Sequence, residues 1–210
     1  MKNPFLAVGV LCLILAWIGP VPSLAEKTFY GHMIMHMLVV AIASPFIALG
    51  IIRSPFDPAL KYPSLFAPVP AAMGELVIVW AWHAPSLHHF ARHSNSGFML
   101  EQGLFLFAGV WVWLSSLSGS TSGDRERMGA GIIGLLITSM HMTLLGALLN
   151  LSGRALFHHG GHGTLTAIED QQMGGAIMLV VGGIAYLTGG LWLALCLIKV
   201  NKSTADLETL

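Results

Sequence analysis

Charged side chains are scarce in this sequence, and cysteine is almost absent. Aspartate, glutamate, lysine and arginine together make up 10% of the 210 residues, whereas hydrophobic residues make up 55%. A soluble domain carries about 25% charged residues, so this composition excludes an ordinary soluble protein and favours a membrane protein. The formal net charge is zero, which leaves no basic surface for nucleic acid. We therefore expect membrane lipid, and no nucleic acid, around the chain.

The two cysteines, Cys12 and Cys196, lie in apolar stretches far apart in the sequence. This spacing provides neither a disulfide framework nor a CxxC metal site. The sequence also lacks a nucleophile elbow, a P-loop, a Rossmann fingerprint and an HExxH motif. We accordingly expect no catalytic residue and no enzyme activity. A metal site would have to be built from histidine, methionine and acidic residues.

Six apolar segments divide the chain, at about residues 4–19, 29–52, 70–86, 97–118, 129–151 and 170–198. Most of them approach the length of about 20 residues that a helix needs to span a bilayer. The sequence therefore predicts an all-α, polytopic membrane helix bundle of about six transmembrane helices. This bundle would form a single integral membrane domain over residues 1–210.

The first apolar segment also has the features of a signal peptide. Lys2 precedes the apolar core, and small residues follow it at Ser23 and Ala25. Such a segment is either removed from the mature protein or kept as a span. Removal of residues 1–25 would not change the topology of the other five segments.

Lysine and arginine are unevenly distributed between the two sides of such a bundle. With the N-terminus placed inside, seven of these ten residues fall on the inner side, and three fall outside, at Lys27, Arg92 and Arg154. The positive-inside rule then favours an orientation with both termini in the cytoplasm. In this orientation all ten histidines fall on the outer half, which predicts a site that faces the periplasm.

The most informative motif is GHMIMHM, which begins at Gly31 inside the second apolar segment. His32 and His36 are four residues apart and lie on one face of a helix, where two imidazoles can bind one metal ion. Met35 shares this face. Imidazole and thioether together suit copper, especially Cu(I), and polar residues inside a membrane usually serve a function. The alternative is a pair of histidines that form hydrogen bonds to a neighbouring helix.

Two further histidines come from other apolar segments. His83 lies near the outer end of the third segment and is either a ligand or an interfacial anchor beside Trp82. His141 lies deeper, in the fifth segment, and is either a ligand or a buried histidine with a satisfied hydrogen bond. A b-type haem is an alternative to copper, because His36 could pair with His83 or His141 on a facing helix.

Acidic residues near the imidazoles can hold them in one tautomer by accepting their second N–H. Asp170 is the preferred candidate for this role, and Glu101 is the second. Glu75 lies near the inner end of the third segment, where we expect it to cap the helix or to extend to the interface. Because the inner halves offer almost no other charge, a metal permease is a weaker alternative.

Six more histidines cluster in two outer connections. They either capture metal ions or belong to solvated loops, and the second interpretation is favoured. These residues are His88, His89, His93, His158, His159 and His162.

The order of the motifs resembles that of the CtaG-like family of membrane proteins, which assist cytochrome c oxidase assembly. The matching pieces are HMIMHM at 32–37, SPF at 44–46, WHAP at 82–85, Glu101, WVW at 111–113, LLGALL at 144–149 and EDQQMGG at 169–175. Together they span most of residues 29–190. The sequence departs from the family at Gln102, where the family often shows histidine. The family is multispanning and is unrelated to a single-span copper chaperone of the same name.

The resemblance implies a protein of the bacterial cytoplasmic membrane that supports the maturation of a haem-copper oxidase by handling copper as Cu(I) or Cu(II). The expected partners are a subunit of the oxidase or a periplasmic copper donor. The resemblance and the motifs above together lead us to expect metal ligands at His32, His36, His83, His141 and Met35. Asp170 and Glu101 are expected to orient these ligands.

Overall fold

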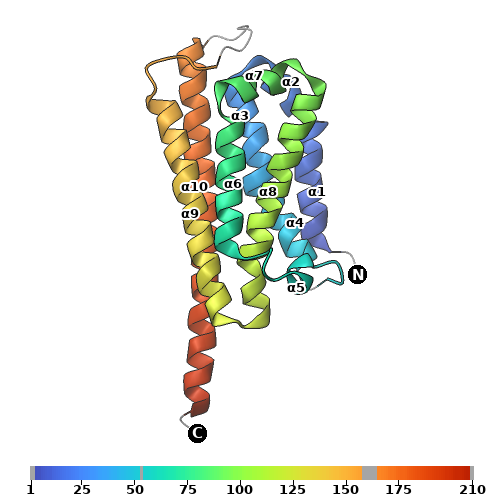
Figure 1. Ribbon diagram of the computed structural model, residues 1–210, viewed down its shortest axis with the longest axis vertical. Helices are drawn as coiled ribbons and strands as arrows, with labels where there is room; N and C mark the ends of the chain where they lie inside the picture. Colours follow the sequence, from blue (N-terminus) through green and yellow to red (C-terminus); the bar gives the residue numbers. More distant parts are fainter. Residues whose placement is uncertain (1–2, 53, 158–164, 209–210) are drawn as a thin grey trace.

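The computed structural model describes residues 3–52, 54–157 and 165–208, which fold into helices joined by turns, without a strand. Successive long helices run in alternating directions (Figure 1). Helix α1 (Pro4–Trp17) begins and α10 (Ala167–Glu208) ends at the same end of the bundle, which we call the terminal end. The short helices α2 (Val21–Lys27) and α7 (Pro85–His93) lie at the opposite end, which we call the α7 end. The prediction of an all-α bundle is confirmed.

The remaining elements are α3 (Phe29–Met37), the π-helical turn η1 (Leu38–Ala43), α4 (Ser44–Ile51), α5 (Pro58–Lys61), α6 (Pro68–Trp82), α8 (Asn95–Ser122) and α9 (Arg125–Leu151).

Four helical segments of the described chain are long and apolar enough to cross a membrane, and they are Phe29–Ile51, Asn95–Ser120, Arg125–Leu151 and Ala167–Asn201. A bend of 41° separates α1 from α2, and these two helices together would make a fifth span. Helix α6 is apolar but has only 15 residues. Each of the six expected segments therefore contains a helix, but four or five of them, and not six, have the length of a full span.

Proline and capping residues fix where several helices begin and end. Pro68 and Pro85 open α6 and α7, where the first N–H groups have no intrahelical partner in any case. The Ser94 hydroxyl caps α8 by accepting a hydrogen bond from the N–H of Gly97 at 3.2 Å. Gly123 ends that helix with a φ of 70°, which glycine adopts without steric penalty.

The span that carries the histidine motif widens at η1. Pro45 has no N–H to donate to the preceding turn, and the N–H of Ser44 bonds to the carbonyl of Val39, five residues back. The Ser44 hydroxyl donates to the same carbonyl at 2.7 Å. The indole N–H of Trp113 donates to the carbonyl of Val40 at 3.1 Å. Side chains inside the bundle therefore satisfy the backbone groups that the wider turn releases.

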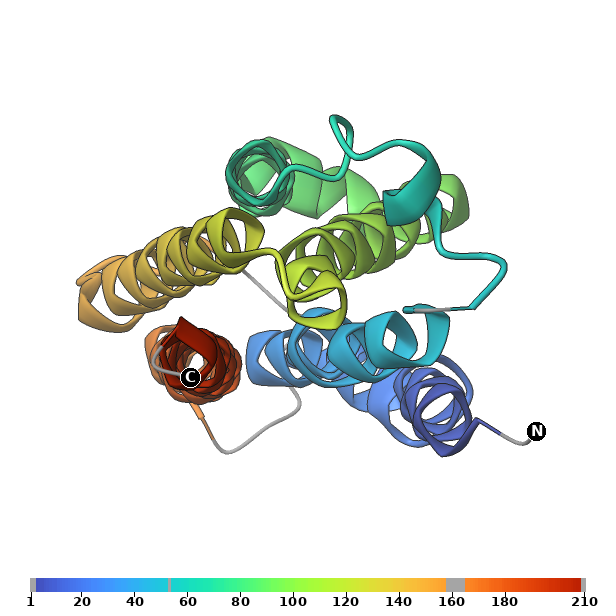
Figure 2. The same cartoon turned by 90° about the horizontal axis from the view of Figure 1, so that it is seen from below.

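The histidine-bearing span lies at the centre of the bundle. Seen from the terminal end, it lies between α1 and α10 (Figure 2). Helix α3 packs against α10, and α8 packs against η1 and α4. Helix α6 packs against both α8 and α9. This arrangement lets side chains from α3, α6, α8 and α9 meet inside the bundle.

Helices α9 and α10 form a closely packed pair. A Cβ added at Gly146 would lie 2.8 Å from the carbonyl oxygen of Gly175, and small residues of this kind let helices approach closely in lipid. Helix α10 has 42 residues, which corresponds to about 63 Å at 1.5 Å per residue. It extends beyond the rest of the bundle at the terminal end (Figure 1).

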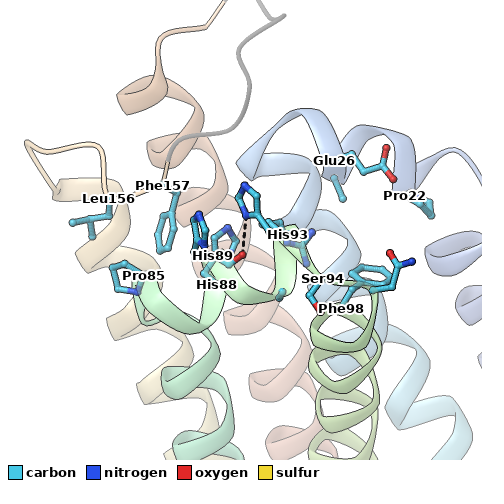
Figure 3. A pocket seen from close by; sticks show the side chains of 14 residues that line it. Pro22, Glu26, Pro85, His88, His89, His93, Ser94, Phe98, Leu156 and Phe157 are labelled. Carbon is cyan, nitrogen blue, oxygen red and sulfur yellow. Dashed lines mark hydrogen bonds between the residues drawn. The ribbon is translucent and has the colours of Figure 1, made fainter.

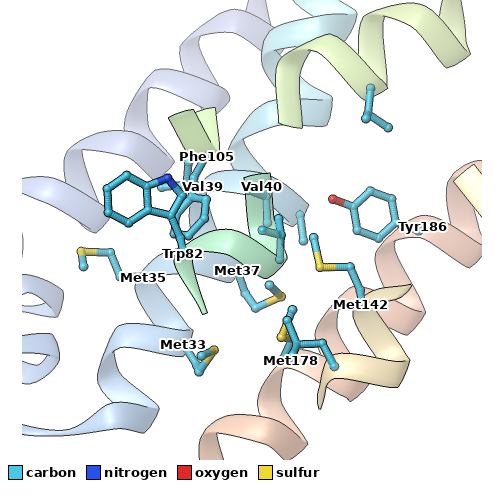
Figure 4. Packing of buried hydrophobic residues seen from close by; sticks show 14 of the residues in the cluster. Met33, Met35, Met37, Val39, Val40, Trp82, Phe105, Met142, Met178 and Tyr186 are labelled. Carbon is cyan, nitrogen blue, oxygen red and sulfur yellow. The ribbon is translucent and has the colours of Figure 1, made fainter. Parts of the chain in front are cut away.

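The hydrophobic core is rich in methionine. Its members include Met33, Met35, Met37, Met142 and Met178, which are buried together with Trp82, Phe105 and Tyr186 (Figure 4). Leucines and other large apolar side chains are exposed along α1, α9 and α10. Exposed apolar surface of this extent is expected where a helix faces lipid.

Candidate metal centre

Three buried side chains converge near the α7 end of the bundle. His32 of α3, His88 of α7 and Glu101 of α8 each offer a ligand atom, and these atoms lie within 4.8 Å of one another. The Nε2 atom of His32 is 3.9 Å from Oε1 of Glu101, and the rings of His32 and His88 meet edge to face with their centroids 4.9 Å apart. We call these residues the trio. A metal ion bound at about 2.0–2.2 Å from each atom would require only small side-chain movements.

Polar atoms of His32 and Glu101 lack the hydrogen bonds that burial normally demands. Both ring nitrogens of His32 and the Oε1 atom of Glu101 have no hydrogen-bond partner among the described residues, although both side chains are fully buried. A buried polar atom without a partner costs about 1–3 kcal/mol. A metal ion would use the same lone pairs and supply the missing interaction. The residues present therefore fit a metal ion.

The second oxygen of Glu101 is held by neighbouring side chains. Oε2 accepts hydrogen bonds from the Arg92 guanidinium and from the Gln102 amide, the latter at 3.2 Å. The side-chain carbonyl of Gln102 accepts a further hydrogen bond from the indole of Trp17 at 3.1 Å. These contacts leave Oε1 directed at His32, and the fixed charge of Arg92 compensates the buried carboxylate.

His36 and His83 continue the cluster toward the middle of the bundle. Their rings meet edge to face with centroids 5.2 Å apart, and the centroid of His83 is 6.2 Å from that of His32. Nδ1 of His83 donates to the carbonyl of Val79 at 2.6 Å, which leaves Nε2 as the nitrogen available to a metal. Nε2 of His83 and both nitrogens of His36 have no hydrogen-bond partner within the part of the chain that the structure describes. The structure thus brings together three of the predicted ligands.

His141, the fourth predicted histidine ligand, lies on α9, farther from the α7 end. Its Nε2 lies 4.0 Å from Oε2 of Glu75, while Oε1 of Glu75 accepts a hydrogen bond from the Tyr186 hydroxyl at 2.9 Å. Tyr186 in turn stacks on Trp113. We call Glu75, His141 and Tyr186 the deep cluster.

The structure corrects the expectation that Glu75 caps a helix or extends to the interface. Its side chain is fully buried, on the same face of α6 as Val79 and Trp82. This spacing of four and seven residues is that of one helical face, and it was the signal in the sequence that pointed to a buried glutamate. The deep cluster was therefore missed because Glu75 was judged by its depth along the span alone.

Asp170 is also placed differently from the prediction. Its two carboxylate oxygens accept hydrogen bonds from the backbone N–H groups of Phe29 and Tyr30, each at 2.8 Å. These N–H groups begin α3, have no intrahelical partner and favour an acidic neighbour. Asp170 therefore fixes the start of the helix that carries His32, whereas Glu101 approaches the imidazole itself.

His88 was not among the predicted metal ligands, because the favoured interpretation of its surroundings was a solvated loop. This stretch is helix α7, and His88 is only 4% exposed. Phe29 and Phe157 flank its ring at centroid distances of 5.7 and 4.5 Å. Pro85 at the first helical position, with His88 and Ala91 on one face, was the signal for an amphipathic helix. The other predicted group, His158, His159 and His162, lies outside the described residues.

Met35 is fully buried in the methionine-rich core (Figure 4). It lies on the same helix as His32 and His36. Its role as a ligand stays a prediction.

A pocket opens beside His88 at the α7 end, with a volume of about 650 Å³. Figure 3 shows His88, His89 and His93 together along this pocket, with Glu26 across from them. His89 and His93 are exposed, whereas His88 both lines the pocket and contacts the ring of His32. The pocket therefore leads from the surface to the buried trio.

Comparison with known proteins agrees with the motif order. A family model described as cytochrome c oxidase caa3 assembly factor (Caa3_CtaG) matches residues 4–199. No curated protein and no solved structure matches the chain. The matched region includes the trio, the deep cluster and nearly all of the remaining sequence. The chain therefore belongs to the family of cytochrome c oxidase caa3 assembly factors.

Proposed function

We propose that this protein binds copper inside the membrane and delivers it during the maturation of a haem-copper cytochrome c oxidase. Membership of the assembly-factor family supports a role in oxidase maturation. The trio carries the copper proposal, because two imidazoles and a carboxylate place their ligand atoms within 4.8 Å of one another in a buried site. Copper is the cargo here, and the side chains bind and release it without acting as catalytic residues.

The ligand chemistry favours copper over hard cations. Magnesium and calcium prefer sites made of oxygen ligands, whereas imidazole suits copper and thioether suits Cu(I). His32, His36, His83 and His88 supply imidazoles from three helices. Cu(II) would use the trio, and Cu(I) would use the imidazoles with Met35 as a further ligand. A site that can exchange its ligands is what a delivery protein requires.

The α7 end is assigned to the periplasmic side of the bacterial cytoplasmic membrane. The basic residues of the terminal end include Lys61, Arg125, Arg127 and Lys199. An excess of lysine and arginine is typical of the cytoplasmic side of a membrane protein. The pocket beside His88 would then receive copper from a periplasmic donor, and an oxidase subunit would be the recipient.

Haem b is less well supported than a copper ion. Bis-histidine ligation needs two imidazoles on opposite faces of a porphyrin. The centroids of His36 and His83 are 5.2 Å apart, at an interplanar angle of 66°. Phe105 packs against both rings, at 4.1 and 6.1 Å. Phe105 thus occupies space beside both rings that a flat macrocycle would need, and a Soret band in the purified protein would contradict the copper proposal.

Copper binding by the purified chain tests the proposed function. The protein in lipid nanodiscs is titrated with Cu(I) against a chromophoric chelator and, separately, with Cu(II) under electron paramagnetic resonance. We expect high-affinity binding. The affinity should fall at least about 100-fold in His32→Ala, because loss of a residue that only orients a metal ligand already lowers metal affinity 10- to 100-fold. His89→Ala is the matched control, because His89 is exposed on the same helix as His88.

Two results would contradict the proposal. One is an intact protein that binds no copper in either oxidation state. The other is a His32→Ala variant with the affinity of the intact protein. In cells, we expect His32→Ala to lower the amount of copper-loaded oxidase, and His89→Ala to leave it unchanged.

A further inference from the structure

We propose that Arg92 determines which oxidation state of copper the protein holds, by favouring Cu(I) over Cu(II) at the trio and the imidazoles beside it. The proposal rests on the proposed copper-binding function and concerns only the form of the ion. Arg92 is not a ligand, because a guanidinium has no lone pair to offer a metal. It acts through its positive charge, which is paired with the carboxylate of Glu101.

The charge of Arg92 lies close to the place that a bound ion would take. Its guanidinium donates to Oε2 of Glu101, while Oε1 of the same carboxylate faces Nε2 of His32 at 3.9 Å. A hydrogen bond, the width of one carboxylate and a metal–oxygen bond would separate an ion on Oε1 from the guanidinium nitrogen, which is at most about 7 Å. Glu101 and His32 are fully buried, so little water screens this short separation.

Arg92 is held at this position by its surroundings. Only 12% of its side chain is exposed. Its Cζ atom lies 5.3 Å from the centre of the Phe98 ring, and a guanidinium over an aromatic ring gains a cation–π attraction. Arginine also keeps its charge at any ordinary pH. The positive charge is therefore a permanent part of the site.

The charges around the trio leave no excess of negative charge for a divalent ion. Glu101 and Arg92 cancel each other, and the imidazoles of His32 and His88 bind a metal in their neutral form. Glu26 lies across the pocket, but it is exposed, so water and salt screen its charge. A bound Cu(I) thus adds one net positive charge to a buried site, whereas Cu(II) adds two. Because the Coulomb energy is proportional to charge, Arg92 repels Cu(II) twice as strongly as Cu(I).

The hydrogen bonds to Glu101 also restrict its use as a ligand. Oε2 accepts from Arg92 and from the Gln102 amide, so the carboxylate presents only Oε1 to an ion. Cu(II) favours square-planar or tetragonal sites of nitrogen and oxygen ligands, and the trio offers three ligand atoms. The imidazoles beside the trio bring no negative charge. Charge and ligand supply therefore both disfavour Cu(II).

Affinities of charge variants for the two ions test this selection. The native chain and Arg92→Gln are compared in lipid nanodiscs, in a mildly alkaline buffer in which a proton competes least for Glu101. Cu(I) and Cu(II) affinities are measured separately, each against a chelator for that oxidation state. We expect Arg92→Gln to raise the ratio of the Cu(II) to the Cu(I) affinity at least about tenfold. Arg92→Lys keeps the charge and should keep the native ratio. Arg154→Gln, at an exposed position of the same end, should also keep it.

A second pair of variants isolates the same charge if Arg92→Gln does not accumulate. Glu101→Gln and the double variant Arg92→Gln/Glu101→Gln both lack the carboxylate and differ only at Arg92. The double variant leaves no charge of the buried pair without its partner, which is the change that proteins tolerate best. We expect its ratio of Cu(II) to Cu(I) affinity to exceed that of Glu101→Gln at least about tenfold.

The outcomes separate this inference from the proposed function. A ratio that is unchanged or lower after removal of Arg92 overturns the selection. A lower ratio is the result expected if Arg92 only positions Glu101, because Cu(II) depends on the carboxylate more than Cu(I) does. A native chain that binds neither ion means that the copper-binding function itself fails. A native chain that binds copper with the same ratio as Arg92→Gln leaves that function standing and overturns this inference alone.

Discussion

The trio and the deep cluster combine a buried glutamate with imidazole, but they compensate the carboxylate in different ways. Glu101 is paired with the guanidinium of Arg92, next to a pocket that opens to the surface. Glu75 instead meets the Tyr186 hydroxyl and the ring of His141. Arginine keeps its charge at any ordinary pH, whereas phenol and neutral imidazole carry none. The carboxylate of the trio is therefore balanced by a fixed cation, whereas Glu75, which pairs with no lysine or arginine among the described residues, is neutral when it carries a proton.

The largest expected effect concerns the ion pair of the trio. Arg92→Gln leaves the Glu101 carboxylate buried without its cation, and loss of one partner of a buried pair costs about 3–5 kcal/mol. Because Glu101 can take up a proton, we expect about 3 kcal/mol, measured by thermal or denaturant unfolding in detergent. Arg154→Gln, at an exposed position, is the control. If the two variants are equally stable, pairing with Arg92 does not distinguish Glu101 from Glu75.

The second effect separates the trio from the deep cluster. Glu101→Gln should weaken copper binding by the purified chain about 10- to 100-fold, because the carboxylate either binds the ion or orients His32. Glu75→Gln should bind copper with nearly the affinity of the native chain, because Glu75 contacts His141 and Tyr186 and is not part of the trio. Chelator competition measures both affinities. If Glu75→Gln impairs binding as strongly as Glu101→Gln, the two clusters form one site.

The third effect concerns how the trio is positioned. Asp170→Asn keeps one acceptor but loses the charge that holds the first N–H groups of α3. We expect a loss of stability of about 1 kcal/mol, the usual value for a helix cap, and a modest loss of copper affinity. Glu126→Gln, at an exposed acid in the first turn of α9, should change neither quantity. A large loss of copper with unchanged stability would restore a direct role for Asp170 in the metal site.

The smallest effect is expected at Tyr186. Tyr186→Phe removes the hydrogen bond to Glu75 and should destabilise the protein by about 1 kcal/mol, without changing copper affinity at the trio. Tyr62→Phe, at a residue that is 58% exposed, is the matched control. Reduced copper affinity in Tyr186→Phe would mean that the deep cluster influences the first binding step.

The helices and part of the site could be predicted because they depend on short-range patterns. Apolar segments of sufficient length indicated the helices, and a spacing of four residues placed His32 and His36 on one face. His83 was expected to lie close to them, because it is also placed near the outer end of its span. These inferences need only helix geometry and the thickness of the membrane.

The remaining site residues depend on which helices face each other. His88 reaches the trio because α7 folds across the end of the bundle, and Asp170 caps α3 because α10 packs against it. A single sequence does not specify such pairings. Depth along a span was also an incomplete guide, since Glu75 lies deep inside and is held there by a neighbour from α10.

The π-helical turn η1 sets the rotational phase between the two halves of its span. Each residue of an α-helix advances the helix by about 100°, and a π turn accommodates one residue more than an α turn. Gly50 of α4 contacts α1 so closely that an added Cβ would lie 2.9 Å from Leu6. With α4 locked in this way, the same residues wound as an ordinary α-helix would rotate His32 and His36 by about 100°, away from the other imidazoles. The extra residue that the wider turn accommodates therefore keeps the histidine motif facing the candidate metal centre.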